Sequence, residues 1–107
     1  MSGYTSIKSE VLMTLNERMP ELEERFGVER ICLFGSVARG EDTAESDIDF
    51  AVSFSPEYDK YMNFLNLSDF LEELFGRNID LLTERSIHPK LKPFIASDSI
   101  LCTPVKA

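Results

Sequence analysis

The chain has 107 residues, so we expect a single domain over residues 1–107. Hydrophobic residues make up 43% of it and charged residues 28%, which is ordinary globular usage and argues against a disordered or fibrous protein. The net charge of −8 argues against a general nucleic-acid binder, because such a chain repels phosphate backbones. No apolar run approaches the roughly 20 residues that span a membrane, and the N-terminus lacks a signal-peptide pattern, so we expect a cytoplasmic location.

The first half of the chain predicts a helix, a strand and a short second helix. From Ser6 onward apolar residues recur at a spacing of four, which is typical of an amphipathic helix. Pro20 is expected to kink or restart this helix, and Gly27 to end it. Val28 to Phe34 is the first predicted strand, and after Gly35-Ser36 a short helix runs through Arg39.

The second half predicts further strands that alternate with helices. These are a strand from Asp47 to Phe54, a helix from Lys60 to Phe75 that ends at Gly76, a short strand from Asn78 to Leu82, a helix from Pro89 to Ser97, and an edge strand from Ile100 to Val105. The fold class is therefore α/β or α+β, a small β-sheet with helices packed on it.

Two cysteines, Cys32 and Cys102, lie far apart in the chain and each in an apolar stretch. Two are too few for a disulfide scaffold, so we expect both to be buried, reduced thiols. The sequence also lacks the ligand spacing of a zinc site.

Gly35-Ser36 is the first of three features that indicate a functional site. Unpaired backbone N–H groups at a helix start can hold an anion such as phosphate. Gly35 would let the backbone approach closely, Ser36 adds a hydroxyl donor, and Arg39 could reach the same anion one turn later. A Gly-Ser pair is also found in many ordinary turns.

Asp47-Ile48-Asp49 is the second feature. Residues two apart on a strand point to the same face, so both carboxylates would project together and repel each other. A hard divalent cation such as Mg²⁺ would offset that repulsion and still bind substrate phosphate. The alternative is that Asp47 caps the end of a loop while Asp49 faces solvent.

Asp80 is the third feature, because it stands alone within an apolar strand. If that strand lies beside the strand with Asp49, the three carboxylates could hold two metal ions, and Asp80 could take a proton from an acceptor hydroxyl. The alternative is an Asp on a solvent-facing strand surface. Taken together, the three features fit metal-assisted attack on the α-phosphate of a nucleotide.

Gly35 to Gly40, followed by Ser46-Asp47-Ile48-Asp49-Phe50, resembles the signature of the polymerase-β-like nucleotidyltransferase superfamily. Over residues 7–105 the chain is similar to its smallest members, the minimal nucleotidyltransferases or MntA-like antitoxins. The resemblance implies a polymerase-β-like fold, ATP as substrate and Mg²⁺, as two ions. It implies that Gly35 and Ser36 bind the triphosphate with Arg39 beside it, and that Asp47, Asp49 and Asp80 form the catalytic, metal-binding set.

The resemblance also implies a partner, an all-helical HEPN ribonuclease toxin that receives AMP on a tyrosine and is thereby blocked. The short chain independently favours an acceptor surface supplied by a partner or by a second copy, so a homo- or hetero-oligomer is expected. Two alternatives stay open, namely transfer to a small molecule such as an aminoglycoside, and a non-catalytic antitoxin that neutralises its partner by contact alone.

Overall fold

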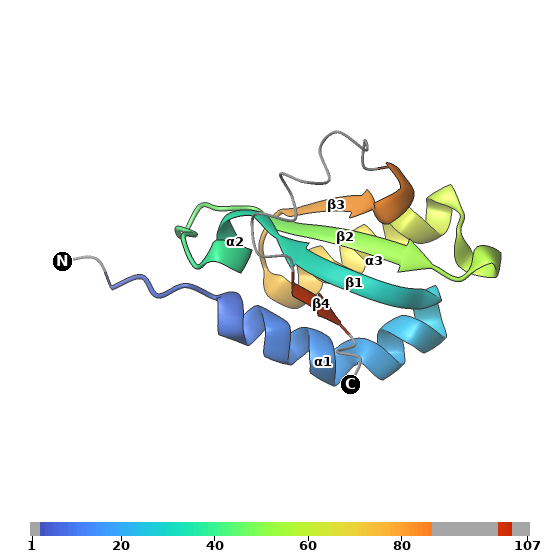
Figure 1. Ribbon diagram of the computed structural model, residues 1–107, viewed down its shortest axis with the longest axis horizontal. Coiled ribbons are helices and arrows are strands. Elements are labelled where there is room, and N and C mark those ends of the chain that lie inside the picture. Colours follow the sequence, from blue (N-terminus) through green and yellow to red (C-terminus); the bar gives the residue numbers. More distant parts are fainter. Residues whose placement is uncertain (1–2, 87–100, 104–107) are drawn as a thin grey trace.

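A computed structural model describes residues 3–86 and 101–103 (Figure 1). The elements follow in the order α1 (Lys8–Phe26), β1 (Val28–Phe34), α2 (Gly35–Arg39), β2 (Ile48–Phe54), the 3-10 turn η1 (Pro56–Tyr58), α3 (Tyr61–Phe75), β3 (Ile79–Thr83), the 3-10 turn η2 (Glu84–Ser86) and β4 (Leu101–Thr103). Each predicted strand and helix within the described residues is present, and over residues 3–86 the bounds are shifted by two residues or fewer. The helix predicted from Pro89 to Ser97 lies outside the described residues.

The four strands form one mixed sheet in the order β3-β2-β1-β4. The central pair, β1 and β2, is antiparallel, and β4 runs antiparallel to β1 at the edge. β3 pairs with β2 in parallel, which is possible because the long helix α3 connects them. The mixed α+β class is therefore confirmed, and β4 is an edge strand as predicted.

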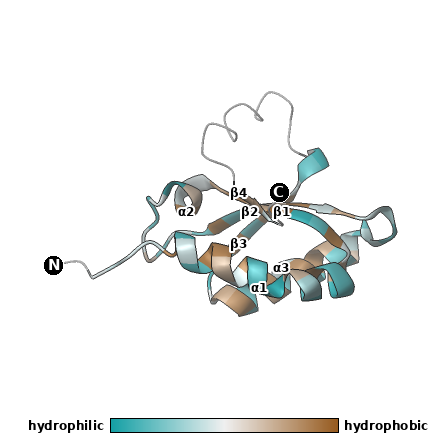
Figure 2. Cartoon of the chain, turned by 60° about the horizontal axis from the view of Figure 1, so that its bottom comes forward, coloured by the Kyte–Doolittle hydropathy of each residue, from teal (hydrophilic) through white to brown (hydrophobic). Residues whose placement is uncertain are grey.

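Both long helices, α1 and α3, pack on the same face of the sheet, and the short helix α2 lies at its end (Figure 2). The core lies between the sheet and these two helices, because alternate residues of β2 point toward the helices and are fully buried, namely Ile48, Phe50 and Val52. The facing helix side chains recur at helical spacing and are also buried, namely Val11, Leu15, Met19, Leu22 and Phe26 of α1 and Leu67 and Leu71 of α3. None of the described helices is long and apolar enough to cross a membrane.

Pro20 does not restart the first helix, because α1 continues through it as one element and ends at Gly27. Proline removes the N–H that would bond the carbonyl of Asn16. Both residues are on the exposed side, where water can take that carbonyl, while Met19 and Leu22 remain buried in the core. Burial of the apolar stripe therefore holds the helix together across the missing bond.

The expectation of two reduced thiols is wrong, because Cys32 and Cys102 form a disulfide. They are directly paired across the antiparallel strands β1 and β4, with their Cα atoms 4.0 Å apart. The apolar surroundings that indicated buried thiols are those of neighbouring strands, and the strand register brings the two sulfur atoms together. The disulfide links the edge strand to the centre of the sheet.

Candidate active site

Asp49 and Asp80 lie side by side on the face of the sheet opposite the two long helices. Their strands are parallel neighbours, and the register pairs Asp49 with Asp80 and, on the other side, with Phe34 at the end of β1. Because Ile48 and Phe50 point into the core, Asp49 between them points away from it. The condition set for Asp80, that its strand lies beside the strand with Asp49, is therefore met.

Gly35 begins α2 directly after β1 and lies against the carboxyl group of Asp49. A Cβ atom at this position would be 3.0 Å from Asp49 Cγ and closer still to its Oδ2 oxygen. The backbone of Gly35 also has a φ of +76°, which side chains disfavour. Glycine is therefore required here both for the turn and for the close approach to Asp49.

The pKa of Asp49 is raised from 3.8 to about 6. Burial is the main cause, followed by the negative charge of Asp80 and a hydrogen bond with its carboxyl group. The charge of Asp47 raises this pKa further, and the guanidinium group of Arg39 lowers it. Burial and the neighbouring carboxylates therefore disfavour the anionic form of Asp49, and Arg39 offsets this only in part.

The remaining predicted site residues are Ser36, Arg39 and Asp47, and they do not form a compact cluster with this pair. Ser36 is half-buried in the first turn of α2, and Arg39 is exposed and donates from Nε to Glu41 at 2.7 Å. Asp47 is exposed and lies one residue before β2. Over residues 3–86 and 101–103, no three acidic, histidine or cysteine side chains converge closely enough to form a metal site as they stand.

The donor chemistry of Asp47, Asp49 and Asp80 nevertheless fits a hard divalent cation. All their donors are carboxylate oxygens, which Mg²⁺ prefers. The repulsion that raises the pKa of Asp49 is also the interaction that a bound cation would relieve. Asp49 and Asp80 would form the close pair, and rotation of the exposed Asp47 side chain would add the third group.

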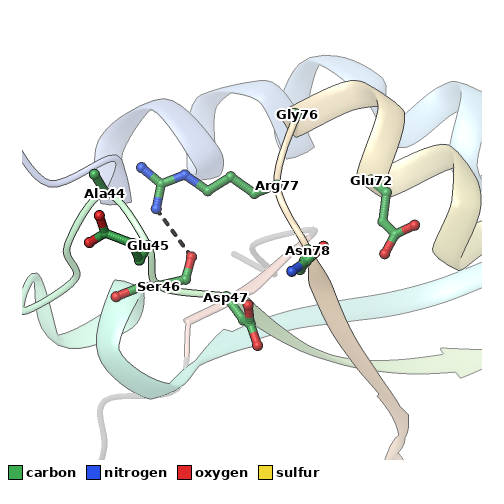
Figure 3. A pocket seen from close by; sticks show the side chains of 8 residues that line it. All are labelled: Ala44, Glu45, Ser46, Asp47, Glu72, Gly76, Arg77 and Asn78. Atoms are coloured by element: carbon green, nitrogen blue, oxygen red, sulfur yellow. Dashed lines mark hydrogen bonds between the residues drawn. The ribbon is translucent and has the colours of Figure 1, made fainter.

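Sequence reasoning missed the surroundings of Asp47. A pocket of about 510 Å³ opens beside it, between the loop from α2 to β2 and the end of α3. Figure 3 shows Arg77 reaching across this pocket to Ser46. The one available signal was that Arg77 is the only basic residue between Lys60 and Arg85 in an acidic stretch.

A mixed sheet with helices on one face, and with a Gly-Ser turn beside paired aspartates on the other, defines the class of small polymerase-β-like nucleotidyltransferases. The family pattern described as "Nucleotidyltransferase domain" matches residues 13–102, and the chain belongs to this family. The resemblance to minimal nucleotidyltransferases, and with it the expectation of an enzyme, is confirmed.

Protein adenylyltransferase MntA of Thermococcus cleftensis is 40% identical over 87 residues, which are 81% of this chain and 85% of that one. A solved structure, described provisionally as a minimal nucleotidyltransferase, is similar with a TM-score of 0.71 and 34% identity over 86% of this chain and 93% of the other. A crystal structure of a toxin–antitoxin with AMP-PNP is similar with a TM-score of 0.56 and 26% identity, over 71% of this chain and 62% of that one.

Proposed function

We propose that this nucleotidyltransferase transfers AMP from ATP to a hydroxyl group, specifically a tyrosine, of a HEPN-type ribonuclease toxin and so acts as its antitoxin. The observation that carries the proposal is the Asp49–Asp80 pair beside Gly35. A protein acceptor is supported by the name of the Thermococcus relative, and a nucleotide and a toxin partner by the toxin–antitoxin structure with AMP-PNP. The net charge of −8 would also favour association with a basic, RNA-cleaving partner.

In the proposed reaction the acceptor oxygen forms a bond to the α-phosphorus of ATP. The bond from that phosphorus to the bridging oxygen breaks, and pyrophosphate leaves with the electron pair. Asp80, which is exposed on the open face, receives the proton of the acceptor hydroxyl. Asp47, Asp49 and Asp80 would hold Mg²⁺, which when bound neutralises charge on the phosphates and orients them.

The triphosphate would lie along the start of α2. Gly35 has no side chain to obstruct it, and Ser36 supplies a hydroxyl donor. Arg39 would add a cationic donor by exchanging its contact with Glu41, which is an exposed ion pair and therefore weak. Asp47 is exposed and stands two residues before Asp49, and its carboxylate would complete the set of oxygen ligands.

The test uses ATP labelled at the α-phosphate with Mg²⁺, the purified protein and lysate of the source cells. We expect label on one protein band, lost in Asp49→Asn and in Asp80→Asn. Asp69→Asn is the matched control, because Asp69 is exposed on α3 away from the pair. Label on a small molecule instead would identify the other acceptor class, and neutralisation of the toxin by Asp49→Asn would leave a contact-only antitoxin.

A further inference from the structure

Asp47 differs from Asp49 in what fixes its position. Asp49 is within β2 and is paired on both sides, with Phe34 and with Asp80. Asp47 is the last residue of the loop that joins α2 to β2, and its side chain is exposed. Loop residues are held less firmly than strand residues unless other groups anchor their backbone.

Two peptide groups adjoin Asp47, and both are anchored by the turn between α3 and β3. The carbonyl oxygen of Ser46, before Asp47, accepts a hydrogen bond from Arg77 Nη1 at 3.2 Å. The N–H of Ile48, after Asp47, donates to the carbonyl oxygen of Asn78 at 3.1 Å. Consecutive residues of one turn therefore hold the chain on either side of this aspartate, and Figure 3 shows the hydrogen bond from Arg77.

The guanidinium group of Arg77 holds the rest of the loop as well. Nη1 also donates to the carbonyl oxygen of Thr43 at 2.8 Å, while Nη2 donates to the hydroxyl oxygen of Tyr4 at 2.9 Å. The guanidinium group lies over the Tyr4 ring, 5.5 Å from its centroid. Arg77 thus connects the loop before Asp47 to the N-terminal segment.

The N-terminal segment is in turn fixed by Asp42, which is only 7% exposed although it belongs to the same loop. Its carboxylate accepts hydrogen bonds from the hydroxyl groups of Tyr4 and Ser6 and from the N–H of Ile7 at 3.2 Å. Burial alone would raise the pKa of Asp42, but the hydrogen bonds from Ser6, from Tyr4 and from backbone N–H groups together outweigh it and leave this pKa below its usual value. Tyr4, to which Arg77 donates, is therefore itself held by a buried carboxylate.

We infer that Arg77 is a positioning residue, which sets the Asp47 carboxylate at the metal site through the Ser46 carbonyl group. The inference rests on the proposed function, because it takes Asp47 as a metal ligand. Arginine suits the role since its planar fork donates to several acceptors at once, whereas the single ammonium group of lysine cannot span the same carbonyl and hydroxyl oxygens.

The test compares Arg77→Met, Arg77→Lys, Asp47→Asn and the double variant Arg77→Met/Asp47→Asn with the unaltered protein. Mn²⁺ binding is titrated by the EPR signal of the free ion, alongside thermal unfolding and label transfer. Removing a group that orients a metal ligand weakens metal binding by about 10–100-fold, and we expect that loss for both Arg77 variants. Arg18→Met is the control, because it removes one exposed cation from an ion pair on α1.

The double variant separates positioning from general destabilisation. If Arg77 acts through Asp47, Arg77→Met changes Mn²⁺ affinity no further once Asp47 is Asn. Additive losses, or folded Arg77→Met and Arg77→Lys proteins that bind Mn²⁺ like the unaltered one, would overturn the inference. If Arg77→Met does not fold, Arg77→Lys decides alone. An unaltered protein that binds Mn²⁺ yet transfers no label would instead count against the proposed function.

Discussion

Replacing Gly35 with alanine would place a methyl group against the Asp49 carboxyl group. The new Cβ atom would be 3.0 Å from Asp49 Cγ, which is closer than such atoms normally approach, and nearer still to Oδ2. Asp49 is part of a paired strand, so its backbone cannot move away without disturbing the sheet. The side chain must turn, and the Asp49–Asp80 pair is then lost.

Two costs determine the expected loss of stability. The φ of +76° at Gly35 is unfavourable for alanine by about 1–2 kcal/mol. Overpacking against Asp49 adds about 1–3 kcal/mol, so Gly35→Ala should lower the free energy of unfolding by roughly 2–5 kcal/mol. Gly40 is a matched control, because its φ is +72° and a Cβ there would meet nothing within 4 Å. Gly40→Ala should therefore show only the first cost.

Urea unfolding measures both variants, and a double-mutant cycle locates the second cost. Asp49→Ala removes the atoms that the methyl group would strike and leaves only its own Cβ, at 3.3 Å. In that background Gly35→Ala should be no worse than Gly40→Ala. Label transfer by Gly35→Ala should fall by about 100-fold, as is typical when a reacting group is misplaced. Equal losses of stability for Gly35→Ala and Gly40→Ala would refute the reasoning.

Three further predictions concern pH, redox state and the N-terminal anchor. Because the pKa of Asp49 is about 6 when folded and lower when unfolded, the Asp49 carboxyl group should contribute a loss of stability to the metal-free protein as pH rises from about 4 to 6, and Asp49→Asn should remove this contribution from the pH profile in urea unfolding. Reduction of the disulfide between Cys32 and Cys102, 70 residues apart, should lower the free energy of unfolding by about 4 kcal/mol. Asp42→Asn should cost about 1–3 kcal/mol by the same assay, since it weakens a buried set of hydrogen bonds.

Each of these predictions has a result that would contradict it. A pH profile unchanged by Asp49→Asn would mean that its carboxyl group titrates normally in the folded protein. Thiol titration of the denatured, unreduced protein should find no free thiol at Cys32 and Cys102, and two free thiols would contradict the disulfide. Full stability of Asp42→Asn would show that its carboxylate does not hold the N-terminal segment.

The sequence predicted the elements well because local patterns determine them. The bounds of β1 agree to the residue, since Gly27 and Gly35 flank a stretch that ends in the apolar run from Ile31 to Phe34. Pairing of Asp80 with Asp49 was only conditional, because it depends on which strands become neighbours and in what register. The local sequence pattern determines neither the neighbouring strand nor the register, since any apolar strand could occupy the position beside β2.

What the sequence could not predict are contacts between distant segments. Cys32 and Cys102 each have the local surroundings of a buried thiol, and only the pairing of β1 with β4 joins them. Asp42 lies in a polar loop that reads as solvent-exposed, and its burial depends on the N-terminal segment folding back onto it. Arg77 likewise donates its hydrogen bonds to residues more than 30 positions away.

Successive side chains of β2 point to opposite faces of the sheet, so the residues that stabilise the core alternate with the carboxylate proposed for the reaction. Ile48, Phe50 and Val52 are fully buried and hold the sheet against the helices. Asp49, between them, is destabilised as an anion, since its pKa is raised by burial and by Asp80. Such a charge can persist only because neighbouring core contacts hold its backbone regardless of its own unfavourable environment. Replacing Asp49 with asparagine should therefore stabilise the metal-free protein at neutral pH while it removes activity. Truncating Phe50 should lower both the stability and the activity.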